Sequence, residues 1–409
     1  MEHSLSSKIL IVEDSRAFRN YLHSLLSDAG YDVYTAESIE CARTILNQKH
    51  DFLCAVLDYC LPDGQDGEII DLVLDYQHKV IVLTAMFQEE IRERVIAKGV
   101  LDYILKDSMS SVSYLLPLVN RLTHNRDHKA LVVDDSKVVR RHISQLLEGQ
   151  YINVIQAEDG QQAIDILEQN PDVTFIITDH DMPIKDGISM IRDIRTQYDK
   201  NDLAILGLSG SDDRTMTARY LKAGANDFLH KPFNQEEFFC RVHQILDMKE
   251  ATGKLYRLAN QDALTGLWNR RYMFQHFDNK SELQNIAMLD IDFFKKVNDN
   301  FGHDGGDAAL ITLARILKLY FADDTVVRFG GEEFCIQSNS PVEDFVTRLE
   351  HMRKRIETTV IPHLEHKIII TVSIGVSSIE ASLEEQIKLA DDRLYQAKEN
   401  GRNQIISNS

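Results

Sequence analysis

The first 250 residues contain an internal repeat whose two copies place polar residues at the same spacing. The segment 8–15, KILIVEDS, recurs as 129–136, KALVVDDS. In both copies an aspartate follows the opening acidic pair by 44 residues, and a hydroxyl side chain precedes a lysine by 22 residues. The corresponding pairs are Asp14 and Asp58, Asp135 and Asp179, Thr84 and Lys106, and Ser209 and Lys231. Spacing shared at four positions indicates that one folding unit has been duplicated.

Each copy alternates short apolar runs with amphipathic segments, for instance 17–26 in the first copy and 138–147 in the second. This alternation predicts an α/β fold in which a doubly wound parallel sheet is covered by helices. Such sheets bind ligands at the carboxyl ends of their strands, which is where the repeated acids fall. We therefore expect one domain over 6–124 and a second over 127–248.

The repeated residues resemble those of the receiver domains of two-component response regulators, which have the flavodoxin-like fold also called CheY-like. The resemblance implies that each receiver holds one Mg²⁺ through an acidic pair after the first strand, an aspartate after the third, and a main-chain carbonyl. Because Mg²⁺ lets an anionic aspartate attack a phosphoryl donor, the implied phosphoacceptors are Asp58 and Asp179. The implied ligands are Glu13, Asp14, Asp58 and the carbonyl of Cys60 in the first copy, and Asp134, Asp135, Asp179 and the carbonyl of Asp181 in the second.

The resemblance also implies a switch in each copy. A hydroxyl would bind the new phosphoryl oxygens, a lysine would pair with their charge, and an aromatic side chain would change rotamer on activation. The implied switch residues are Thr84, Tyr103 and Lys106 in the first copy, and Ser209, Phe228 and Lys231 in the second. Pro232 follows the lysine of the second copy, whereas Asp107 follows that of the first. Both copies keep the phosphoacceptor, so the sequence leaves open which receiver switches.

The last 150 residues contain apolar runs that end abruptly in acid. The run 286–289 reads as a buried strand followed by Asp290, and the runs 326–329 and 334–336 read as strands joined by a Gly-Gly turn beside Glu332 and Glu333. If these strands are neighbours, three carboxylates converge and repel one another unless a hard cation joins them. Oxygen ligands of this kind suit Mg²⁺ carrying a phosphorylated substrate.

This region resembles the GGDEF domain of diguanylate cyclases in its Gly-Gly-Glu-Glu-Phe form. The matching blocks follow the family's order over about 150 residues, which makes them far more specific than a lone pentapeptide. They are 262–271, 290–299, 301–307, 329–334, 371–376, 390–398 and 401–403. The resemblance implies an α/β, nucleotidyl-cyclase-like domain with a mixed antiparallel sheet, which we expect over 261–408.

The resemblance further implies that two GTP molecules condense to cyclic di-GMP with release of two diphosphates. Two Mg²⁺ ions, with Mn²⁺ as a possible substitute, would be held by Asp290, the carbonyl of Ile291, Glu332 and Glu333. Glu332 would also assist removal of the proton from the attacking 3′-hydroxyl. Because one domain holds one GTP, the reaction implies a homodimer.

The remaining implied contacts concern the base and the phosphates. An amide and a carboxylate can read the edge of guanine and penalise adenine. The guanine-reading pair is Asn298 and Asp307, the candidate phosphate contacts are Lys295, Lys398 and Arg402, the glycines that allow main-chain approach are Gly330 and Gly331, and the motif histidine is His303. Each basic residue has an alternative role as an ordinary solvated surface charge.

Two further segments carry expectations. The stretch 249–260 reads as a connecting helix that continues the last receiver helix, with a loop around Thr252-Gly253 as the alternative. Many family members place an inhibitory Arg-x-x-Asp product site before the GGDEF turn. Phe321 stands here at the arginine position of 321–324, so we expect weak or absent product inhibition through that site.

Composition and charge limit the partners and the compartment that we expect for this chain. The net charge of −19 argues against a general nucleic-acid footprint, and no run of about 18 apolar residues predicts membrane insertion. An apolar strand begins within ten residues of the N-terminus, leaving no room for a signal peptide, and the five scattered cysteines suit a reducing compartment. We expect a cytoplasmic protein.

These features together predict a response regulator with two receivers and a diguanylate cyclase output, phosphorylated by a histidine kinase or a phosphotransfer protein. Two alternatives remain open. The last domain could bind GTP or cyclic di-GMP without turnover, or the receivers could serve as a phosphorelay adaptor.

Overall fold

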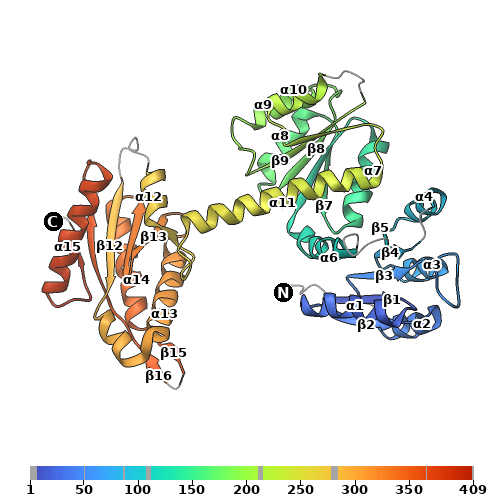
Figure 1. The fold of residues 1–409 in the computed structure, drawn as a ribbon. Helices are drawn as coiled ribbons and strands as arrows, with labels where there is room; N and C mark the ends of the chain where they lie inside the picture. Colours follow the sequence, from blue (N-terminus) through green and yellow to red (C-terminus); the bar gives the residue numbers. More distant parts are fainter. Residues whose placement is uncertain are drawn as a thin grey trace. The chain divides into compact units, whose positions relative to one another are not determined.

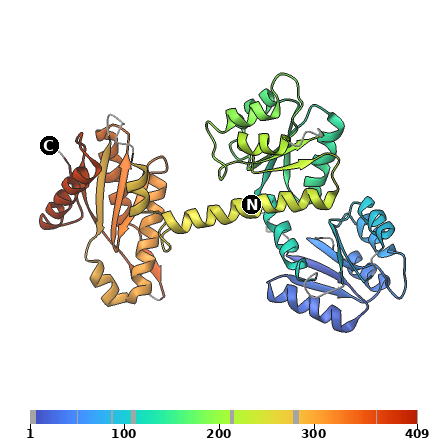
Figure 2. The same cartoon turned by 45° about the horizontal axis from the view of Figure 1, so that its top comes forward.

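The computed structural model describes residues 7–49, 51–85, 88–106, 112–210, 215–277, 284–364 and 366–407. The chain divides into two compact units, 1–251 and 252–409. Figures 1 and 2 show the ribbon, with the two receivers in blue and green and the last domain in orange and red. None of the described helices is both long and apolar enough to cross a bilayer.

The first receiver is a five-stranded parallel sheet in the order β2-β1-β3-β4-β5. Its elements are β1 (Lys8–Val12), α1 (Arg16–Asp28), β2 (Asp32–Ala36), α2 (Ile39–Gln48), β3 (Cys54–Asp58), α3 (Glu68–Asp75), β4 (Val80–Thr84), α4 (Glu89–Ala97), β5 (Asp102–Leu105) and α6 (Leu115–His124). Alternate residues of β1 enter two different apolar cores, since Leu10 and Val12 pack on one face and Ile9 and Ile11 on the other. Helices therefore cover both faces, as the parallel sheet requires.

The second receiver repeats this topology in the order β10-β9-β8-β6-β7. Its elements are β6 (Lys129–Val133), α7 (Lys137–Gly149), β7 (Asn153–Ala157), α8 (Gly160–Gln169), β8 (Phe175–Thr178), α9 (Gly187–Ile194), β9 (Ala204–Ser209), α10 (Met216–Ala223), β10 (Asp227–His230) and α11 (Gln235–Asn260). The predicted duplication and the doubly wound parallel sheets are confirmed.

The two receivers differ in how the helix after the fourth strand is packed. In the second receiver the fully buried Tyr220 of α10 lies over Gly207 of β9, and its hydroxyl donates a hydrogen bond to the carbonyl of Leu208 at 3.0 Å. A Cβ added to Gly207 would lie 2.3 Å from the tyrosine ring. The positions with the same spacing in the first receiver are Val82 and Val95. The second receiver therefore pairs a tyrosine with a glycine at positions where the first receiver has two valines.

We expect Gly207→Ala to lower the free energy of unfolding by about 1–3 kcal/mol, because the new methyl group overpacks a filled core. Thermal or urea unfolding followed by circular dichroism measures this. Gly149→Ala is the matched control, since a Cβ there meets no atom within 4 Å. Equal stability of the two variants would contradict the packing argument.

Helix α11 runs without interruption from Gln235 to Asn260. Its first turns bury Phe238, Val242 and Leu246 against the second receiver. The helix continues through Thr252 and Gly253, so the alternative of a loop at this point is wrong. The connection to the last domain is therefore helical.

The last domain contains a mixed six-stranded sheet in the order β11-β13-β14-β12-β17-β18. Its elements are β11 (Trp268–Asn269), α12 (Arg270–His276), β12 (Asn285–Ile291), α13 (Phe294–Tyr320), β13 (Thr325–Gly330), β14 (Glu333–Ser338), α14 (Val342–Glu357), β15 (Ile361–His363), β16 (His366–Ile368), β17 (Val372–Ser377), α15 (Leu383–Glu399) and β18 (Ile405–Ile406). The central strand β12 pairs antiparallel with both β14 and β17, which agrees with the predicted mixed antiparallel sheet.

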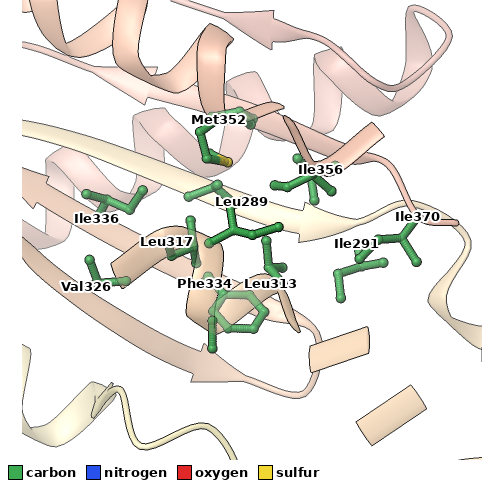
Figure 3. Packing of buried hydrophobic residues seen from close by; sticks show 14 of the residues in the cluster. Leu289, Ile291, Leu313, Leu317, Val326, Phe334, Ile336, Met352, Ile356 and Ile370 are labelled. Atoms are coloured by element: carbon green, nitrogen blue, oxygen red, sulfur yellow. The ribbon is translucent and has the colours of Figure 1, made fainter. Parts of the chain in front are cut away.

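The core of this domain lies between the sheet and helices α13 and α14. Figure 3 shows Leu289 and Phe334 of the central strands packed against Leu313, Leu317 and Met352. The opposite face of the sheet packs a smaller cluster with side chains of α12 and α15. Burial on both faces fixes where β12 and β14 end, and the candidate site lies at these ends.

Candidate functional site

The three acids predicted to converge in the last domain lie close enough for the charges of Glu332 and Glu333 to act on Asp290. β12 and β14 are antiparallel neighbours, and Asp290 is the register partner of Glu333. Glu332 lies in the turn that precedes β14. The sequence placed this turn at the Gly-Gly pair, but a bulge after Arg328 pairs Gly330 with Glu333, so the turn residues are Gly331 and Glu332. Glu332 therefore lies at the tip of the hairpin.

The electrostatics of the cluster favour a bound cation. Asp290 is only 6% exposed, and its burial raises the pKa of its carboxyl. The ammonium of Lys398, 2.9 Å away, opposes this shift, whereas the charges of Glu332 and Glu333 raise the pKa further. Lys398, predicted as a phosphate contact, thus places its positive charge next to Asp290. A Mg²⁺ ion could occupy the position of this ammonium, because carboxylate oxygens are its preferred ligands.

Arg328 braces the hairpin that carries these acids, a role that the sequence analysis missed. Its guanidinium donates two hydrogen bonds to the carbonyl of Gly331, at 3.0 and 2.8 Å, and a third to Asp262 at 2.9 Å. Asp262 also accepts hydrogen bonds from the main chain and side chain of Thr265. Gly331 has a left-handed backbone, with φ of 48°, and directly precedes Glu332. The sequence feature that could have indicated this role is a charged residue, Arg328, within an otherwise apolar strand.

We expect Arg328→Ala to lower kcat by about tenfold to a hundredfold, because small displacements of reacting groups are costly. Arg328→Lys would recover little, since an ammonium does not reproduce the planar fork. Cyclic di-GMP formation measures both variants, with Arg355→Ala on the exposed side of α14 as control. An unchanged rate in Arg328→Ala would contradict the bracing role.

The predicted guanine-reading residues lie on the two sides of a kink in α13. Gly302 interrupts the helix with non-helical φ and ψ of 74° and 174°. Before the kink, the side chain of Asn298 approaches Gly306 so closely that an added Cβ would lie 2.0 Å from its Oδ1. Asp307 follows Gly306 and is exposed, as is His303 beside the kink. The side chain of Asn298 therefore lies against Gly306, the residue that directly precedes Asp307.

The predicted phosphate contacts gather near the start of α13. Phe293 has a left-handed backbone, with φ of 57°, and is 51% exposed. The Arg402 guanidinium and the Lys296 ammonium lie 4.3 and 4.4 Å from the centre of its ring. Lys295 is exposed in the first helical turn. Phe293 thus forms a platform between cations, and the sequence analysis named only Lys295 and Arg402 of this group.

The position that holds an arginine in the family's product site is occupied by a core residue. Phe321 is 1% exposed and packs edge-on against Phe345 with ring centres 5.9 Å apart. Asp324 is paired with Arg348 at 2.8 Å.

We expect cyclic di-GMP to inhibit weakly or not at all through this position, because a buried phenyl ring cannot bind an anionic or purine group as an arginine would. Rate measurements at rising product concentration test this. Submicromolar inhibition that is lost on substituting Asp324 would contradict it.

The first receiver brings its predicted acids together at the carboxyl end of its sheet. Oxygens of Glu13, Asp14 and Asp58 lie within 4.8 Å of one another. Lys106 bridges Glu13 and Asp58 at 2.6 Å each. Burial raises the pKa of Glu13, and Lys106 opposes this shift. Cys60 is partly buried in the loop after β3 and donates its N–H to Asp58 at 3.4 Å.

The second receiver has a similar lysine bridge between two carboxylates. Lys231 bridges Asp134 at 2.6 Å and Asp179 at 2.7 Å. Burial raises the pKa of Asp179, Lys231 opposes this shift, and the charge of Asp134 adds to it. Asp135 and Asp181 are exposed beside this pair. In both receivers a lysine ammonium bridges two carboxylates, whose oxygens are ligands of the kind that Mg²⁺ prefers.

The predicted hydroxyl and aromatic switch residues are buried. Thr84 is 1% exposed and Tyr103 is 8% exposed. Phe228 packs against Tyr220 with ring centres 5.1 Å apart. Ser209 is 1% exposed at the end of β9. The Lys231–Pro232 peptide is cis, whereas Asp107 of the first copy lies outside the described residues.

Comparison with known families agrees with this architecture. Residues 9–112 and 130–243 match the response regulator receiver domain, and residues 259–404 match the diguanylate cyclase GGDEF domain. The chain belongs to the response regulators that join receiver domains to a C-terminal GGDEF domain of the diguanylate cyclase class. The predicted family is thereby confirmed.

Individual relatives match all or part of the chain. The response regulator PleD of Caulobacter vibrioides is 26% identical over 455 aligned positions, covering 98% of this chain and 99% of PleD. The diguanylate cyclase DgcM of Escherichia coli is 35% identical over 187 positions, covering 43% of this chain and 45% of DgcM. A solved two-component response regulator/GGDEF protein superimposes with a TM-score of 0.55 at 40% identity, covering 59% of this chain and 99% of that one. The PleD-like order of domains therefore extends over nearly the whole chain.

Proposed function

We propose that this chain condenses two GTP molecules into cyclic di-GMP, with release of two diphosphates, under the control of aspartyl phosphorylation. The proximity of Asp290 to Glu332 and Glu333, together with the pairing of Asp290 with the Lys398 ammonium, carries this proposal. The same domain carries cations that suit a triphosphate, and an amide and a carboxylate that suit guanine.

Two Mg²⁺ ions, or Mn²⁺ in their place, would be held by Asp290, the carbonyl of Ile291, Glu332 and Glu333. Bound there, they would neutralise the triphosphate and polarise the α-phosphate. Lys398 would leave Asp290 for the phosphate oxygens when the metal enters, which reconciles its observed pairing with the predicted contact.

The protein's own groups would supply positioning and proton transfer. Glu332, at the hairpin tip, would accept the proton of the 3′-hydroxyl as it attacks the α-phosphorus. Asn298 and Asp307 would hold the guanine edge, and a mismatched base would leave their polar groups unpaired. Lys295 and Arg402 would bind the β- and γ-phosphates, and Gly330 and Gly331 leave room for the main chain to approach. His303 would line the nucleotide side of the kink.

The reaction needs two such sites facing each other, so the active form is a homodimer. Each receiver would hold one Mg²⁺ and accept a phosphoryl group from a histidine kinase or a phosphotransfer protein, at Asp58 or at Asp179. The added charge would draw Lys106 or Lys231 and the neighbouring hydroxyl toward the phosphoryl oxygens and change the surface of that receiver.

Cyclic di-GMP formation from GTP and Mg²⁺, with and without acetyl phosphate, tests the proposal. We expect turnover to rise with the phosphodonor. We expect it to fall about a hundredfold or more in Glu332→Ala, because this substitution removes both a metal ligand and the group that accepts the proton. Glu343→Ala, an exposed acid on α14, is the control. GTP binding by a confirmed dimer without product would support the alternative of a silent binding module.

A further inference from the structure

Asp292 is a buried carboxylate that the proposed chemistry does not use. It is 5% exposed and lies two residues after Asp290, at the end of β12. Its oxygens accept hydrogen bonds from Thr371 Oγ1 at 2.7 Å, Ser373 Oγ at 2.6 Å and the main-chain N–H of Asn403 at 3.0 Å. The carboxylate thus joins three segments that are distant in the sequence.

The charge of Asp292 is satisfied by these donors alone. Within the part of the chain that the structure describes, no lysine, arginine or histidine nitrogen pairs with it. A buried carboxylate without a counter-ion is costly unless several donors replace its water. Three charge-assisted hydrogen bonds provide that replacement, and they also hold the donors in one geometry.

One of these donors controls an unusual turn. Arg402 and Asn403 both have left-handed backbones, with φ of 66° and 47°, which is an unfavourable conformation for residues other than glycine. The Asn403 N–H bonds Asp292, the Asn403 side chain accepts from Arg353 at 2.7 Å, and the Arg402 N–H bonds the carbonyl of Ala397 at 3.0 Å. These bonds hold the turn against its strain.

The turn determines where the Arg402 side chain lies. Its guanidinium lies 4.3 Å from the ring of Phe293, the residue that follows Asp292. Phe293 is itself left-handed and is the N-cap residue of helix α13. Asp292 therefore directly precedes Phe293 in the sequence, and its side chain accepts a hydrogen bond from the main chain of Asn403, which follows Arg402.

We propose that Asp292 is a positioning residue that sets Arg402 for the phosphate groups of GTP. This inference rests on the proposed function, in which Arg402 binds the triphosphate. Asp292 does not touch the substrate. It acts through the Asn403 N–H, which fixes the turn and so the direction of the arginine.

A double-mutant cycle of Asp292→Asn and Arg402→Ala tests this role. Asparagine keeps the size of the side chain but replaces one acceptor oxygen with a donor, so the clamp on Asn403 or on Ser373 is weakened. The KM for GTP and kcat are measured for all four proteins, together with the dissociation constant of GTP with Mg²⁺ by calorimetry. Asp344→Asn, an exposed aspartate on α14, controls for the loss of one charge.

We expect Asp292→Asn to raise KM and the dissociation constant of GTP by about tenfold, with a smaller change in kcat. In the Arg402→Ala background, we expect the same substitution to raise these two constants by less than about twofold. Additive effects in the two backgrounds would overturn the inference, because a general loss of stability does not depend on Arg402. An unchanged KM and dissociation constant would overturn it as well.

Two further outcomes separate this inference from the proposed function. If the wild-type protein binds GTP but forms no product, the proposed function fails while the cycle of dissociation constants still decides the inference. If it does not bind GTP, both fail. Should Asp292→Asn not fold, Thr371→Val removes a single donor to the same carboxylate oxygen and takes its place in the cycle, with the same non-additivity expected.

Discussion

The structure depends on carboxylates at strand ends that pair with a lysine. Lys106 and Lys231 each bridge two carboxylates in the receivers, and Lys398 pairs with Asp290 in the last domain. Burial of the surrounding sheet fixes where the strands end, and the acids that follow are therefore held close despite their repulsion. Each lysine lowers the cost of that repulsion and can be displaced by a divalent cation or attracted by a phosphoryl group.

Around the acids of the last domain, backbone conformation matters as much as charge. Gly331, Phe293 and Arg402 are all left-handed, and each lies next to a group assigned to metal or phosphate binding. Hydrogen bonds from Arg328 and to Asp292 hold the first and the last of these turns. At Phe293 and Arg402, which are not glycines, a left-handed backbone is strained, and such strain persists only where surrounding contacts overdetermine it.

The sequence predicted the repeat, the fold class and the convergence of the acids, because spacing and strand-end position determine them. It misplaced the hairpin turn by one residue, since a bulge after Arg328 depends on strand pairing rather than on the Gly-Gly dipeptide. The roles of Arg328 and Asp292 were missed because their partners lie 66 and up to 111 residues away. The packing of Tyr220 over Gly207 was also missed, because it is a tertiary contact between a strand and a helix that no local sequence pattern indicates.

The central claim is that the acidic clusters are cation sites whose lysines hold the place of the metal. Counting Mn²⁺ ions bound per chain by electron paramagnetic resonance, with and without a non-reactive GTP analogue, tests it most directly. The account predicts that ions bound only with the nucleotide disappear in Asp290→Ala, while those bound without it, at the receivers, remain. An equal count in the variant and in the wild-type protein, or no binding at any cluster, would contradict the account.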